Sequence, residues 1–176
     1  MRFRSYQGLS LYLAHKPLVR VLLMNYPIDA RLEHDIRYAE DPGGQPVLTA
    51  YKDSLGYWTI GTGHLLQPQG HDWSGYTITA EQAEIYLSTD LMQAEHLAQR
   101  LPEWNACDTD CRRNALIEIC FNMGGRWLEF HEARAAWVKQ EWDTAAADML
   151  DSLWARQVGQ RAVRLADYVR TGQYPA

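Results

Sequence analysis

The chain has 176 residues, 47% of them hydrophobic and 22% charged, with a formal net charge of −5. This composition is that of an ordinary globular protein and excludes low-complexity or largely disordered classes. Residues 1–31 hold five Lys and Arg against one Asp, whereas residues 32–176 hold twelve against twenty-one Asp and Glu, which argues against a broad basic face for nucleic acid.

The N-terminal segment combines a basic start with apolar residues, so it has to be tested as a targeting signal. His15, Lys16 and Pro17 interrupt the apolar run too early for a signal core, and no stretch approaches the roughly 20 apolar residues that span a bilayer. We predict that residues 1–23 form an extension outside the fold, with no signal peptide, transmembrane segment or stable membrane insertion. A weak surface-binding amphipathic segment is the alternative. The folded domain is expected over residues 24–176.

The segment DARLEHDIRYAEDPGG predicts a first helix that ends at Glu40. Asp29 is a typical N-cap residue, apolar residues follow at helical spacing, and residues 41–44 (DPGG) end the pattern. The next run, PVLTAYKDSLGYWTIGTGHLL, predicts a β-hairpin, because β-branched and aromatic residues flank the turn Asp53–Gly56. Tyr76–Ile78 is a candidate third strand.

Helices are predicted for the rest of the chain. Thr79 and Gln82 have the spacing of a capping box, and helical periodicity then continues over about residues 80–101. The run RRNALIEICFNMGG is apolar on nearly every side, as in a helix buried at the centre of a helical lobe. Shorter helices are expected at about residues 130–140, 143–150 and 161–170, with Gly172 as a C-cap.

These elements predict an α+β fold. A small antiparallel sheet lobe is expected over about residues 41–78 and a bridging helix over about residues 80–101. A larger helical lobe would take about residues 102–176 together with the first helix, with a cleft between the lobes.

The cysteines are expected to have no functional role. Cys107, Cys111 and Cys120 are odd in number, so they cannot all pair, and the C-x-x-C spacing of zinc and redox sites is absent. We therefore predict partly buried thiols in a chain made in a reducing compartment.

Two carboxylates are placed where they could face the same space. Glu40 ends the first helix and Asp53 lies in the hairpin turn. Such a pair suits glycoside hydrolysis, in which one protonated carboxyl donates to the leaving oxygen and an ionised one activates water. In a chain with 22 acidic residues, two solvated loop charges would give the same pattern.

The run YKDSLGYWTIGTGHLL resembles the core motif of the phage-type lysozymes, glycoside hydrolase family 24. The run RRNALIEICFNMGG and the segments after it are similar to the family's central and C-terminal helices, so matched segments extend over about residues 33–174. The resemblance implies a muramidase that cleaves the β-1,4 bond between N-acetylmuramic acid and N-acetylglucosamine in peptidoglycan. It implies inversion at the anomeric carbon and no metal or organic cofactor.

Carried over residue by residue, the resemblance implies three catalytic residues. Glu40 would be the general acid, Asp53 the carboxylate that positions or activates water, and Thr59 a hydroxyl that helps to hold this water. Arg161 stands where the family has an arginine that pairs with the acid. A cationic partner favours the ionised form of Glu40 and apolar surroundings favour the protonated form, and the sequence leaves this balance open.

The chain departs from the family pattern at the acid. Thirteen positions separate Glu40 from Asp53, whereas the family usually has nine, so we infer a four-residue loop insertion. This insertion leaves Asp41 as a rival acid. Glu40 is preferred because it keeps the helix end and the residue type of the family.

Further roles are implied for residues outside the catalytic set. Leu65 and Phe121 match positions that contact the sugar chain, and Asn122 replaces a glutamine with a shorter amide that could reach an acetamido group. Ala133 and Asp148 stand where a serine and an asparagine are usual, so those two roles are not carried over.

One implied pair is structural. His64 resembles a histidine that pairs with a carboxylate on the long helix, here Asp90. We predict no metal at His64, because no second ligand lies at a usable spacing.

The resemblance implies a phage or prophage endolysin that stays in the host cytoplasm until lysis. It would reach its peptidoglycan substrate after a separate membrane-permeabilising protein acts. We expect a monomer that binds no nucleic acid. Two alternatives remain open: an antibacterial effector with the same chemistry, and a non-catalytic peptidoglycan-binding module with a decayed site.

Overall fold

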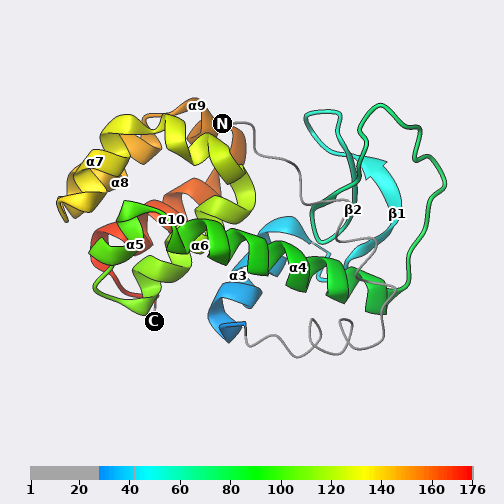
Figure 1. Cartoon of the computed structure of the whole chain (residues 1–176), viewed down its shortest axis with the longest axis horizontal. Helices are drawn as coiled ribbons and strands as arrows, with labels where there is room; N and C mark the ends of the chain where they lie inside the picture. The colour runs from blue at the N-terminus through cyan, green and yellow to red at the C-terminus, as the bar shows by residue number, and fades with distance from the viewer. Residues whose placement is uncertain (1–27, 42, 176) are drawn as a thin grey trace. The chain divides into compact units, whose positions relative to one another are not determined.

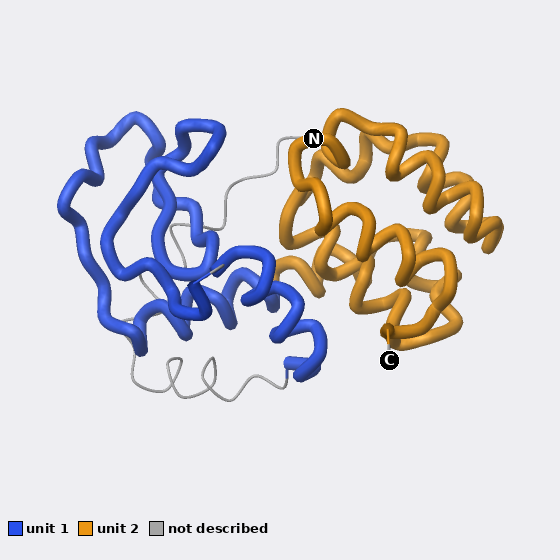
Figure 2. Tube along the Cα trace, turned by 180° about the vertical axis from the view of Figure 1, so that it is seen from behind, with its two compact units in different colours: residues 1–92 blue, residues 93–176 orange. Residues whose placement is uncertain are grey.

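The computed structural model describes residues 28–41 and 43–175 (Figure 1). The predicted extension at residues 1–23 lies outside this part. The chain divides into two compact units, unit 1 over residues 1–92 and unit 2 over residues 93–176, with the boundary inside a helix (Figure 2).

Unit 1 contains a helix, a three-stranded antiparallel sheet of order β1-β2-β3, and the first part of the long helix that crosses the unit boundary (Figure 1). The sheet and helices confirm the α+β class. The bounds are Ala30–Glu40 for α3, Val47–Lys52 for β1, Trp58–Gly61 for β2, His64–Leu65 for β3 and Ala80–Gln99 for α4.

Helix α3 begins and ends where the sequence predicted. The Asp29 side chain accepts a hydrogen bond from the Leu32 N–H at 2.9 Å, which satisfies one of the unpaired donors of the first turn. At the other end, the N–H of Asp41 donates to the carbonyl of Arg37 at 2.8 Å. Glu40 is thus the last residue of the helix.

The predicted hairpin is present, and the third strand of the sheet is β3 (His64–Leu65) and not the candidate Tyr76–Ile78. β1 and β2 pair with Tyr51 opposite Thr59, and β3, which follows β2 at once, pairs with β2 and occupies its other edge. Tyr76–Ile78 forms only an isolated bridge, between Thr49 and Thr77. Two backbone hydrogen bonds flank this bridge, from the Ala50 N–H to the Tyr76 carbonyl at 2.8 Å and from the Ile78 N–H to the Leu48 carbonyl at 2.9 Å, so the segment pairs with the outer edge of β1 over one bridge only.

The core of unit 1 lies between the sheet and α4. Its buried side chains come from the strands, from the segment after β3 and from the start of α4, where Thr79 and Gln82 form the predicted reciprocal capping box. Burying each large aliphatic or aromatic side chain of this kind contributes about 1.5–3 kcal/mol. The core residues are Ile60, Leu66, Ile78, Ala83 and Tyr86.

Unit 2 is helical, and its central helix α6 is buried on nearly every side, as predicted. Three short elements, α5, η1 and α9, were not predicted. Pro102 begins α5, because the first helical position tolerates a missing N–H. The bounds are Pro102–Ala106 for α5, Asp110–Met123 for α6, Gly124–Glu129 for η1, His131–Val138 for α7, Trp142–Leu150 for α8, Leu153–Val158 for α9 and Gln160–Thr171 for α10.

The three cysteines are buried in unit 2 and form no disulfide, as predicted. Burial raises the pKa of the Cys107 thiol, and it raises the pKa of Cys120 to about 12. Thiols with raised pKa values carry little thiolate at neutral pH, so these two are poor nucleophiles.

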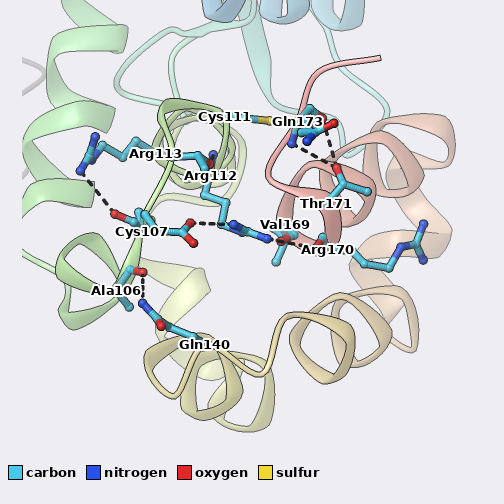
Figure 3. Close-up of polar contacts among 12 residues, drawn as sticks. Ala106, Cys107, Cys111, Arg112, Arg113, Gln140, Val169, Arg170, Thr171 and Gln173 are labelled. Carbon is cyan, nitrogen blue, oxygen red and sulfur yellow. Dashed lines mark hydrogen bonds and ion pairs between the residues drawn. The ribbon is translucent and has the colours of Figure 1, made fainter. Parts of the chain in front are cut away.

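Arg112 ties α6 to the C-terminal end of α10 (Figure 3). Its guanidinium is buried and donates to the carbonyls of Val169 at 2.8 Å and Arg170 at 3.0 Å. It also pairs with Asp108 at 2.6 Å and lies 4.1 Å from the ring centroid of Trp142. The carbonyls at the end of a helix lack partners within the helix, so this side chain acts as its cap.

Gly172→Ala is expected to lower the free energy of unfolding by about 1–3 kcal/mol. Gly172 has φ +67°, and a Cβ on it would lie 2.5 Å from Nη1 of Arg112. Chemical denaturation measures the effect. The control is Gly125→Ala, at a helical position with open space around the new methyl group, where a change within about 0.5 kcal/mol is expected. Equal stability of the two variants would contradict the Arg112 cap.

Candidate active site

Glu40 lies at the C-terminal end of α3, and its carboxylate packs against the turn between β2 and β3. A Cβ built on Gly63 would lie 2.9 Å from Oε2 of Glu40, and Gly63 has φ +76°. Only glycine leaves room for the carboxylate at this distance. The glycine of the GTGH run therefore has a steric function beside the predicted acid.

Asp53 is held by the hairpin turn that it helps to form. Its Oδ1 accepts hydrogen bonds from the N–H groups of Leu55 at 2.9 Å and Tyr57 at 2.8 Å. Its carbonyl accepts from the N–H of Gly56 at 2.9 Å. Oδ2 receives no hydrogen bond from the described part of the chain. One oxygen of this carboxylate thus has a structural function, and the other is available for a ligand or a water.

Thr59 lies on the middle strand, β2, and is 3% exposed. Its hydroxyl donates to the carbonyl of Tyr57 at 3.1 Å, so the hydroxyl proton is already engaged. The oxygen lone pairs can still accept a hydrogen bond. If Thr59 holds the catalytic water, that water has to be the donor.

Tyr51 is a site residue that sequence reasoning missed. Its pKa is raised by burial first, and then by the negative charges of Glu40, Asp41 and Asp53. Tyr51 lies on β1 opposite Thr59, two residues before Asp53. The sequence contained a signal for Tyr51: it lies two residues before Asp53, and in an extended strand residues two apart point to the same face of the sheet.

The side chain of Asp41 makes a hydrogen bond that the sequence did not predict. It is 5% exposed, and the Thr62 hydroxyl donates to its Oδ2 at 2.7 Å. Burial raises the pKa of Asp41, while the Thr62 hydrogen bond and the positive charge of Arg37 act in the opposite direction. The structure therefore places two carboxylates, Glu40 and Asp41, against consecutive residues of the β2–β3 turn.

His64 and Asp90 lie together as the sequence predicted. Nδ1 of His64 is 2.7 Å from Oδ2 of Asp90, and the imidazole stacks on the ring of Tyr86 with centroids 4.3 Å apart. Next to this pair, Leu65 is exposed and is paired in the sheet with Thr59. The contact between His64 and Asp90 links β3 to α4.

The remaining predicted site residues belong to unit 2. Phe121 and Asn122 lie in the last turn of α6 and are half-buried. Oδ1 of Asn122 accepts a hydrogen bond from Nε1 of Trp154 at 2.7 Å, so its NH₂ group is the part left to bind a sugar carbonyl. The sugar-binding roles of these residues and of Leu65 stay predictions.

Arg161 is held by a residue that the sequence did not predict, Glu118. Its Nε donates to Oε1 of Glu118 at 2.9 Å, and Arg164 donates to the same carboxylate at 2.7 Å. Glu118 is 1% exposed, so its charge is stabilised by the two guanidinium groups. The predicted pairing of Arg161 with Glu40 would join the two units and stays a prediction.

No group of three or more His, Cys, Asp or Glu among the described residues is placed to hold a metal ion. None of the described helices combines the length and the apolar character needed to cross a membrane.

One family of known proteins matches most of this chain in sequence. The sequence model of the phage lysozyme family matches residues 45–167, a range that contains Asp53, Thr59 and Arg161 and begins after Glu40 and Asp41. The assignment of the acid therefore rests on the motif and on the structure around it.

Two relatives illustrate the similarity. The pre-baseplate central spike protein of Enterobacteria phage T4 is 31% identical over 148 residues, which cover 71% of this chain but only 26% of that protein. The protein named "Probable T4-type lysozyme 1" of Dictyostelium discoideum is 27% identical over 148 residues, covering 71% of this chain and 87% of that protein. Because the family model matches well over half of its residues, the chain belongs to the phage lysozyme family.

Proposed function

We propose that the protein is a muramidase, a glycoside hydrolase that cleaves the β-1,4 bond between N-acetylmuramic acid and N-acetylglucosamine in peptidoglycan. The observation that carries this proposal is the placement of Glu40 against the β2–β3 turn and of Asp53 in the β1–β2 turn of the same sheet, in a chain of the phage lysozyme family. Carboxylates of different surroundings that face one region are the arrangement that glycoside hydrolysis needs.

In this mechanism Glu40 donates a proton to the leaving oxygen while a water attacks the anomeric carbon. Asp53 orients and activates this water through Oδ2, since Oδ1 is engaged by the turn. Thr59 accepts a hydrogen bond from the same water, because its own proton is donated to Tyr57. Direct attack by water inverts the configuration at the anomeric carbon.

The biological setting that we propose is lysis of a bacterial host by a phage or prophage endolysin. The enzyme would accumulate in the host cytoplasm, depend on a membrane-permeabilising protein and act on the wall as a monomer. A delivered antibacterial effector would use the same chemistry and would differ in its partners.

The proposal is tested by digesting purified peptidoglycan and following the release of reducing ends, with product masses and the anomer measured by NMR. We expect fragments that end in N-acetylmuramic acid and appear first as the α-anomer. Binding to walls without release of reducing ends would instead identify a non-catalytic module. A first product in the β-configuration would refute the inverting mechanism.

A further inference from the structure

The ladder between β2 and β3 is completed by a side-chain amide. Next to the paired residues of the two strands, the N–H of Leu66 donates to the carbonyl of Trp58 at 2.9 Å. Opposite residues of an antiparallel pair that are joined in this way normally exchange both backbone hydrogen bonds. Here the N–H of Trp58 donates instead to Oε1 of Gln69 at 2.7 Å, and Nε2 of Gln69 donates to the carbonyl of Leu66 at 2.7 Å. The amide of Gln69 thus bridges the two strands where the second backbone bond would be.

The contacts of Gln69 require an amide. Its Nε2 also donates to the carbonyl of Trp58 at 3.1 Å, so the side chain bonds both backbone groups of this residue. An acceptor has to face the N–H and a donor has to face the two carbonyls, and an ionised carboxylate has no donor. The loop that carries Gln69 is itself held, because the carbonyl of Pro68 accepts from the N–H of His71 and from Nε1 of Trp73, each at 3.1 Å.

The other edge of the same strand segment holds candidate catalytic groups. The N–H of Tyr57 donates to Oδ1 of Asp53 at 2.8 Å. The carbonyl of Tyr57 accepts from the N–H of Asp53 at 2.9 Å and from the hydroxyl of Thr59 at 3.1 Å. Successive residues of a strand direct their backbone groups to opposite edges, and Trp58 lies between Tyr57 and Thr59. Residues 57–59 are therefore held by Asp53 on the β1 side and by Gln69 on the β3 side.

We propose that Gln69 is a positioning residue of the reaction: by bonding both backbone groups of Trp58, it fixes the strand segment on which Asp53 and Thr59 align the attacking water. This inference rests on the proposed muramidase function. Gln69 acts through the backbone, with no contact to the substrate assigned to it. A small misplacement of an attacking group slows a reaction strongly, so loss of this amide should lower kcat and leave KM nearly unchanged.

The first test is Gln69→Ala, assayed on soluble glycan strands prepared from peptidoglycan. We expect kcat to fall by about tenfold, with KM within about twofold of wild type. The matched control is Gln99→Ala, which removes an exposed amide that bonds to Glu95 and should turn over like wild type. A second control, Ile78→Val, thins the core of unit 1 and should lower the melting temperature without changing kcat.

The second test is Gln69→Glu, which makes the effect depend on pH. A protonated carboxyl has one acceptor and one donor and can stand in for the amide, whereas the ionised form faces the carbonyls of Trp58 and Leu66 without a donor. The ratio of the variant's kcat to that of wild type at the same pH should approach one below about pH 5 and fall about tenfold by pH 8.

Taking this ratio separates the new carboxyl from the groups that both proteins share. Glu40 and Asp53 titrate in both, and so do the exposed charged groups near the loop, Lys52, His71 and Asp72. Gln69→Glu also keeps the inference testable if Gln69→Ala does not fold, because the acidic arm provides a folded reference within one variant.

Hydrogen exchange measured by NMR provides a readout that needs no turnover. Gln69→Ala removes the acceptor of the Trp58 N–H, so this amide should exchange faster. If Gln69 holds the strand for Asp53, the amide of Tyr57 on the opposite edge should exchange faster as well. Faster exchange at Trp58 alone would mean that the amide only completes the hairpin.

Three results would overturn the inference: a wild-type kcat in folded Gln69→Ala, a raised KM with kcat unchanged, or a kcat ratio for Gln69→Glu that is the same at every pH. Failure of the proposed function is separate. It appears as a wild-type protein that releases no reducing ends, while the amides of Tyr57 and Trp58 still respond together to Gln69→Ala.

Discussion

Glu40→Gln is expected to reduce kcat on peptidoglycan by about 10³–10⁴-fold, because the amide cannot donate the proton that the leaving oxygen needs. The amide has the size of the carboxyl, so the contact with Gly63 and the fold should survive. Release of reducing ends measures the loss, and thermal unfolding checks that the variant is folded.

The matched control is Glu132→Gln, the same exchange at an exposed position of α7, which should turn over like wild type. Retention of more than about a tenth of wild-type kcat by folded Glu40→Gln would mean that another group is the acid. Asp41 is then the first residue to examine, since it is the neighbouring buried carboxyl.

Asp53→Asn is expected to lower kcat by about 10²–10³-fold while leaving the hairpin intact. The asparagine oxygen can still accept from the N–H groups of Leu55 and Tyr57, so the turn keeps its hydrogen bonds and loses only the charge that activates water. Steady-state kinetics and circular dichroism separate the two effects.

Asp53→Ala is the companion variant, because it removes the charge and the turn contacts together. It should lose similar activity and, in addition, about 1–2 kcal/mol of unfolding free energy. If Asp53→Asn is as active as wild type, Asp53 serves the turn alone and the water must be activated by another base.

The sequence predicted those parts of the fold that depend on neighbouring residues. The Asp29 cap of α3, the Thr79–Gln82 capping box and the turn at Asp53 each follow from side chains that bond backbone within four positions. The candidate third strand, Tyr76–Ile78, pairs with β1 through a single bridge, because the extent of its pairing depends on residues about 27 positions away that no local pattern shows.

In the candidate site, the motif residues were predicted and the long-range polar contacts were not. Its motif residues were found through their resemblance to a family, but the bond between Asp41 and Thr62 joins positions 21 apart and involves no recognisable spacing. The contact between Glu118 and Arg161, which are 43 positions apart, was missed for another reason. In a helix that is buried on nearly every side, periodicity does not show which polar residue makes such a contact. Long-range polar contacts depend on tertiary packing, which periodicity and propensity do not contain.

The carboxylate of Glu118, shared by Arg161 and Arg164, gives unit 2 a redundancy. A buried charge with a single partner makes that partner indispensable to folding, whereas here the loss of either arginine leaves the other to neutralise the carboxylate. The fold therefore does not depend on Arg161 alone to neutralise Glu118. Related chains could therefore change the residue at position 161 without first finding a compensating change in the core.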